Sequence, residues 1–183
     1  MKQIEEIIHR DISLSYKILK YVNSAGFGLR GKISSIKQAV TMMGNEKLAK
    51  FVTLVLLKGM GEDKPQELVV TAIIRGRFAE LVAESLGLKD QTSDAFLAGM
   101  FSLMDALLDR SMNKILAELP LNDNICGALQ RHPSTLTLIL ETVIAYEQGN
   151  WEKSDIYCQT IMLDKEIAKK LYLEAVLWAE NIE

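Results

Sequence analysis

The chain has 183 residues, of which 49% are hydrophobic and 25% are charged, and its formal net charge is −3. This length suits one domain, or one domain with an extension, and the apolar content excludes a disordered chain. The acidic balance argues against a general nucleic-acid binder, because such proteins need a surplus of lysine and arginine to face the phosphates.

No segment has the character of a membrane span or an export signal. The densest apolar run, Phe51 to Leu57, is far shorter than the roughly 20 apolar residues that cross a bilayer. The chain opens with two carboxylates where a signal peptide would be basic and then apolar. Cys126 and Cys158 lie far apart without CxxC spacing, which argues against a zinc site and a disulfide framework. We expect a cytoplasmic protein with reduced, buried thiols, no membrane contact and no cofactor.

The first third of the chain has the apolar spacing of helices. One helix is expected to end near Gly26, and a second, over residues 36–43, to end at Gly44 after a serine cap from Ser34 or Ser35. The next expected helix, residues 46–60, has only a thin polar face, which predicts that it is buried in the middle of a bundle.

Glycine and proline separate further helical segments in the rest of the chain. The aromatic side chains there are expected to pack in the core, namely Tyr146, Trp151, Tyr172 and Trp178. Since no segment alternates like a strand, the sequence predicts an all-α, compact multi-helix bundle. The expected helices are residues 65–86, 92–108, 112–119, 122–131, 134–148, 152–162 and 165–180.

Two motifs suggest ligand binding, and both fail on context. Residues 26–31 match GxGxxG, but a dinucleotide site needs a strand before the glycines, and a helix is expected there. Residues 35–56 have the outline of a helix-turn-helix. A recognition helix must present polar side chains to base edges, whereas the second helix here turns apolar on nearly every side. DNA binding is therefore the weaker alternative.

Metal-ligating residues are scarce. His9 and His132 are the two histidines, and neither has another histidine one helical turn away. Asp105 and Asp109 share a helix face at i, i+4, but two carboxylates alone do not make a hydrolytic metal site, which needs three or more ligands and a position for water. We predict no metal site and no catalytic residues.

The residues from Asp11 to Ala25 resemble the opening motif of HDOD domains, the HD-related output domains of bacterial signalling proteins. The motif is an acidic residue, Leu-Ser, a basic and leucine-containing turn, and then Val-Asn-Ser-Ala. Residues 33–40 with Met43-Gly44 resemble the second signature of that family. The resemblance implies an HDOD core over residues 1–120, with a helical extension over residues 121–183 packed on it.

Residues 95–107 are similar to the helix that carries the His-Asp doublet in catalytic HD phosphohydrolases. Met104 stands where the ligand histidine would be, and Asp105 alone remains. A thioether and one carboxylate cannot hold a hard divalent ion. The resemblance therefore implies a relative that is not an enzyme, and a degenerate metal-dependent HD-type phosphohydrolase is the alternative.

The tail also resembles a known architecture. Residues 145–151 and 172–179 are similar to the C-terminal region of bacterial proteins that join an EAL domain, a cyclic di-GMP phosphodiesterase fold, to an HDOD domain. This resemblance implies an N-terminally truncated fragment that acts as a signalling output or regulatory module. Its expected partners are an upstream EAL domain or another protein, and self-association is a further expectation. If a polar cluster binds a ligand, Asn23, Ser24 and Arg30 are the candidates, because they flank a loop beside the first motif.

Overall fold

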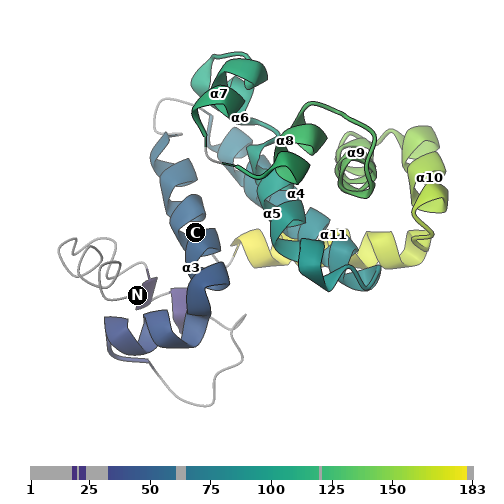
Figure 1. Ribbon diagram of the computed structural model, residues 1–183. Helices are drawn as coiled ribbons and strands as arrows, with labels where there is room; N and C mark the ends of the chain where they lie inside the picture. The colour runs from purple at the N-terminus through teal and green to yellow at the C-terminus, as the bar shows by residue number, and fades with distance from the viewer. Residues whose placement is uncertain (1–17, 20, 24–32, 61–64, 120, 181–183) are drawn as a thin grey trace. The chain divides into compact units, whose positions relative to one another are not determined.

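A computed structural model describes residues 18–19, 21–23, 33–60, 65–119 and 121–180 (Figure 1). These residues form helices and no strand, which confirms the predicted all-α class. The chain divides into two compact units that part near residue 60, and each unit is described by itself. The division at residue 120 that the sequence suggests stays a prediction.

Unit 1, residues 1–59, is built around the helical run α3 (Ile36–Met60). Ser35 caps this run, because its Oγ accepts a hydrogen bond from the amide of Gln38 at 3.2 Å. Gly44 has φ 67° and ψ 176°, so the run is two helices that meet at the predicted glycine. The buried core of the unit consists of Ile18, Val22, Ile33, Ile36, Ala39, Val40, Met43, Leu48 and Phe51.

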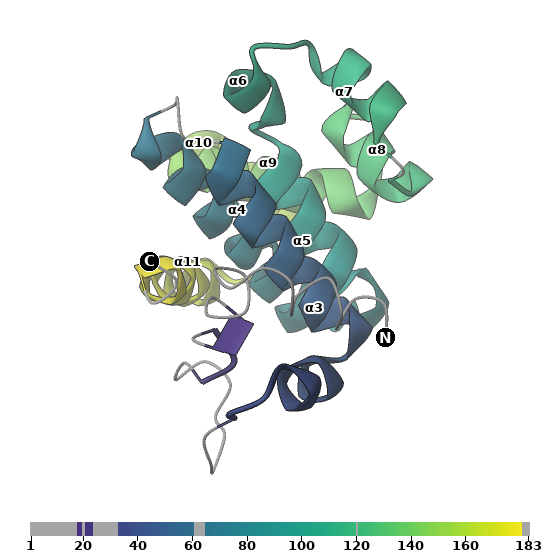
Figure 2. The ribbon, with the colours of Figure 1, turned by 90° about the vertical axis from the view of Figure 1, so that its left-hand side faces the viewer.

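Unit 2 contains the remaining helices, and most of the predicted ends are confirmed. Side chains of Asn122, Ser134 and Asn150 accept the capping hydrogen bonds at three helix starts. Figures 1 and 2 both place α6, α7 and α8 together at one end of this unit. The elements are α4 (Gln66–Ser85), η2 (Lys89–Gln91), α5 (Thr92–Phe101), α6 (Met104–Leu108), α7 (Met112–Glu118), α8 (Asp123–Leu129), α9 (Thr135–Glu147), α10 (Trp151–Thr160) and α11 (Lys165–Glu180).

The predicted single helix over residues 92–108 is wrong. The structure ends α5 at Phe101 and starts α6 at Met104, and Leu103 between them has φ −113° and ψ 9°. Between the two helices the hydroxyl of Ser102 donates to the carbonyl oxygen of Gly99 at 2.6 Å, an acceptor that a continuous helix would offer to the amide of Leu103.

Helices α4 and α5 cross at two glycines. A Cβ atom added to Gly99 would lie 2.6 Å from the carbonyl oxygen of Arg75 and 2.8 Å from the Cα of Gly76. Both obstacles are backbone atoms, which cannot rotate away as a side chain can. The absence of side chains at this point therefore sets how closely the two helices approach.

Helix α4 is the centre of unit 2, because it packs against α5, α9 and α11. Phe78 of α4 is fully buried and makes edge-on ring contacts with Tyr146 and Tyr172, at centroid distances of 5.5 and 5.4 Å. Trp151 was expected in the core but is 59% exposed, because it sits on the outer side of Tyr146. Cys158 is buried and Cys126 is half-buried, and both are free thiols.

Candidate functional site

The position of the His-Asp motif lies in the first turn of α6. Met104 is buried and helps to anchor this short helix, whereas Asp105 is exposed. The Oδ1 atom of Asp105 accepts a hydrogen bond from the amide of Ala106 at 2.9 Å. The aspartate thus faces solvent and binds its own helix start, an arrangement that uses the carboxylate as a local hydrogen-bond acceptor.

The turn after α6 contains an arginine that forms an ion pair with α7. Asp109 ends the helix in the left-handed conformation, with φ 50°. The guanidinium of Arg110 contacts both carboxylate oxygens of Glu118, at 2.5 and 3.0 Å. Its hydrogen bond and charge hold the pKa of Glu118 below the ordinary value. The positively charged side chain closest in sequence to the motif, that of Arg110, is therefore paired with a residue of α7.

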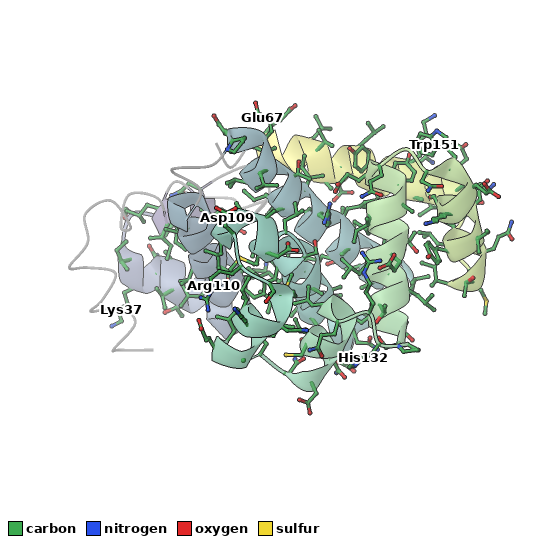
Figure 3. The ribbon with its side chains drawn as sticks, turned by 90° about the horizontal axis from the view of Figure 1, so that it is seen from above. Lys37, Glu67, Asp109, Arg110, His132 and Trp151 are labelled. Carbon is green, nitrogen blue, oxygen red and sulfur yellow. The ribbon has the colours of Figure 1, made fainter. Side chains whose placement is uncertain are left out.

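The structure does not bring the remaining candidate ligands together. His132 is exposed and lies apart from Asp109 and Arg110 (Figure 3). His9 lies outside the described residues. Within the part of the chain that the structure describes, no three histidine, cysteine, aspartate or glutamate side chains form a group that could hold a metal ion.

Of the three predicted binding residues, only Asn23 is described. Its Nδ2 donates to the carbonyl oxygens of Leu19 and Ile33, and its Oδ1 accepts from the amide of Ile33, each at 2.8 Å. The side chain therefore ties the end of one helix to the residues that precede α3. Ser24 and Arg30 lie outside the described residues, so their role in binding stays a prediction.

A buried ion pair joins α4 to α9 and also binds the residue that follows α5, and the sequence did not predict it. Arg75 of α4 is 5% exposed, and its Nε and Nη2 donate to the two carboxylate oxygens of Glu147, at 2.8 and 2.5 Å. Its Nη1 donates to the Oγ of Ser102 at 2.8 Å, directly after α5. We call Arg75, Glu147 and Ser102 the Arg75 network. An arginine beside a glycine in an apolar helix was the visible signal, but nothing in the sequence pairs it with a glutamate 72 positions away.

Burial shifts the pKa of one side chain in α9 and of one in α10. Burial raises the pKa of the Cys158 thiol, and the raising effect outweighs the lowering effects of Ser154 and Lys165. Burial also raises the pKa of Tyr146. A thiol in such a site stays protonated at neutral pH and is a poor nucleophile, so Cys158 is suited to packing. No described helix combines the length and the apolar character that crossing a bilayer requires.

Two curated relatives match nearly the whole chain. The Vibrio cholerae protein named cyclic di-GMP phosphodiesterase CdgJ is 33% identical over 180 residues, which cover 98% of this chain and 42% of that protein. The Bacillus subtilis protein YuxH, whose name assigns no function, is 36% identical over 187 residues, which cover 100% of this chain and 44% of that protein. The chain therefore spans less than half the length of these relatives. No solved structure matches it.

The prediction that the chain is not an enzyme is contradicted by the relative that is named as a cyclic di-GMP phosphodiesterase. The replacement of the ligand histidine by Met104 counts against one kind of active site, the His-Asp metal site, and says nothing of other catalytic chemistry.

The family assignment follows from a match to a family model. The model of the HDOD domain matches residues 1–118, which is more than half of the chain. The matched region includes the two N-terminal signatures and the α4–α5 crossing, and it ends with α7. The chain belongs to the HDOD domain family.

Proposed function

We propose that this chain is a regulatory module of a cyclic di-GMP signalling protein and that it acts by binding another domain of that protein or a protein partner. The observation that carries the proposal is the coverage of CdgJ. That relative, named as a cyclic di-GMP phosphodiesterase, matches 98% of this chain, but the matched part is only 42% of its own length. In CdgJ more than half of the protein therefore lies outside the matched region. A module with the same surroundings has a neighbouring domain to bind.

The surface of unit 2 supports a binding role. Among the described residues, the exposed large hydrophobic side chains other than Met42 all lie between residues 151 and 177. They are Trp151, Ile156, Met162, Ile167, Leu173 and Leu177. These side chains are carried by two consecutive helices, α10 and α11, and the turn between them, and exposed apolar side chains that lie together are typical of places where a protein meets a partner.

The first test of the proposal is the sequence of the gene that encodes this chain. The complete reading frame that contains this chain is expected to encode an EAL domain upstream of it. The full-length protein is then expected to hydrolyse cyclic di-GMP at a rate that depends on this module. A reading frame without a cyclic di-GMP domain would contradict the proposal.

The binding role has a second test in α11 of the full-length protein. Leu173→Asp places a charge on the apolar surface, since this leucine is 53% exposed and contributes little to the core. We expect this variant to change the rate of cyclic di-GMP hydrolysis, whereas Lys170→Asp, on the same helix at an exposed position, should not. Equal rates in both variants and the parent would contradict a binding role for this surface.

Calorimetry with cyclic di-GMP on the chain alone separates direct sensing from partner binding. A regulatory module that works through its neighbour should release no heat of binding, and the rate change should appear only in the longer protein. Hydrolysis by the chain alone would show that the chain itself carries the activity, and would contradict the regulatory role.

A further inference from the structure

The break between α5 and α6 itself contains neither glycine nor proline, although Gly99 lies in the last turn of α5. Residues 100–108 include neither glycine nor proline. Apolar spacing continues across the break, and Met100, Met104 and Leu107 are all buried. Since sharp interruptions of a helix have identifiable causes, a side chain or a tertiary contact must produce this one.

The local cause is the side chain of Ser102. Its hydroxyl donates to the carbonyl oxygen of Gly99 at 2.6 Å, and its amide approaches the same oxygen at 3.3 Å. In a continuous α-helix this oxygen would accept from the amide of Leu103, four residues on. The hydroxyl of Ser102 therefore competes with the amide of Leu103 for this oxygen, and serine is known to compete with the helix in this way.

The hydroxyl of Ser102 is in turn oriented by Arg75. A guanidinium has only donors, so the 2.8 Å contact from Nη1 of Arg75 makes Oγ of Ser102 the acceptor. The single hydroxyl proton is then left to point at Gly99. The close approach of α4 and α5 at their glycines brings Arg75 within reach of this position, since Ser102 lies one turn beyond Gly99.

Glu147 holds Arg75 in this orientation from α9. The two-point contact, at 2.8 and 2.5 Å, fixes the plane of the guanidinium, and the low exposure of both side chains strengthens it. A continuous line of polar contacts thus runs from Glu147, the last residue of α9, through Arg75 of α4 to Ser102, the residue that follows α5.

We propose that residues 92–108 form a two-state helix, in which the Arg75 network holds the break and release of Glu147 lets α5 and α6 join. The joined state is the continuous helix that the apolar spacing predicts. A change at the end of α9 would therefore rotate the first residues of α6, including Asp105, about the axis of the joined helix. Glu147 is a positioning residue, and the inference does not depend on the proposed function.

Amide hydrogen exchange of the chain, read residue by residue by NMR, tests the break itself. Ser102→Ala frees the carbonyl of Gly99, so the amide of Leu103 should exchange about tenfold more slowly than in the parent. The Cα chemical shifts of residues 102–104 should move to helical values. The matched control is Ser85→Ala, because Ser85 makes the same hydroxyl contact to the carbonyl of Val82, at 2.8 Å, where a helix ends. That variant should leave residues 102–104 unchanged.

Glu147→Gln tests the link to α9. Exchange at Leu103 should slow at least about threefold although the substitution is 44 positions away, while the exposed-pair control Asp155→Asn should have no effect there. If Glu147→Gln folds poorly, the double variant Arg75→Met with Glu147→Leu removes both charges and should also slow exchange at Leu103. Unchanged or faster exchange at Leu103 in the folded variant would overturn the proposal, and so would an unchanged Ser102→Ala protein.

Discussion

In the part of the chain that the structure describes, two helical runs are interrupted, and the two interruptions have different origins. In unit 1, α3 bends at Gly44, whose φ of 67° and ψ of 176° suit glycine alone among the residues. In unit 2, the run over residues 92–108 stops at Ser102 and Leu103, where any residue can adopt the observed backbone angles. The first break is a property of one residue, and the second is a property of three helices.

The difference has a practical consequence. A break at one glycine needs no contact from another helix, because glycine adopts such backbone angles without strain. A break that depends on side chains from other helices can be undone by changing a distant residue. The two breaks can therefore be distinguished by substitution, and the following expectations run from the largest effect to the smallest.

Gly99→Ala should have the largest effect, because the new methyl group would lie 2.6 Å from a carbonyl oxygen and 2.8 Å from a Cα atom of α4. The two helices must move apart, which would also take Arg75 away from Ser102. We expect a loss of about 3 kcal/mol in the free energy of unfolding, measured by urea denaturation. Gly127→Ala is the matched control. Its methyl group would meet nothing nearer than 3.8 Å, so α8 should gain a little stability. Equal effects would mean that the crossing is not tight.

Glu147→Gln should lower the free energy of unfolding by about 2 kcal/mol, because it leaves the buried charge of Arg75 without an opposite charge and replaces one of its two acceptors by a donor. The control is Glu118→Gln, which alters an ion pair of similar geometry that is exposed to solvent. Water replaces that partner, so stability should change little. If the two substitutions cost the same, the Arg75 network contributes no more than a surface pair.

Gly44→Ala should cost about 1.5 kcal/mol, and the cost should be entirely conformational, because no heavy atom lies within 4 Å of the added methyl group. The sharpest control is D-alanine at residue 44, introduced by semisynthesis. Its preferred backbone angles mirror those of L-residues, so it should restore the parent melting temperature. A D-alanine protein as unstable as the L-alanine protein would show that the bend is not the source of the cost.

Met162→Gly should have the smallest effect and the opposite sign. Met162 is 90% exposed and follows α10 with φ 57°, a conformation that glycine adopts more easily than methionine. We expect a gain of about 0.5 kcal/mol, seen as a small rise in the midpoint of thermal unfolding. Gly149→Ala, at φ 66°, is the reverse change and should lower that midpoint.

Most of the helix ends could be predicted because their signals are local. Pro65, Asn122, Ser134 and Asn150 each act within one turn of the helix that they begin, and Gly44 and Gly87 have positive φ where a helix ends or bends. The break at Ser102 could not be predicted, because its cause depends on where α4 and α9 lie. The exposure of Trp151 was missed for the same reason.

The candidate site was predicted only in part. The sequence located the motif position at Met104 and Asp105, and helical spacing alone suggested that one of them faces the core. Which partners surround that position is a question of tertiary structure. Arg75 and Glu147 are 72 positions apart, and neither residue type nor spacing marks them as a pair. Ion pairs between distant elements lack the i, i+4 pattern that makes pairs within one helix visible.

The location of the two tryptophans has a consequence for fluorescence measurements. Trp178 packs edge-on against the buried Phe96, whereas Trp151 is largely open to water and touches Tyr146. Both belong to unit 2, and the chain contains no third. Tryptophan emission, excited selectively, will therefore have a shielded component and a quenchable one, and it will follow the melting of unit 2 while leaving that of unit 1 unobserved.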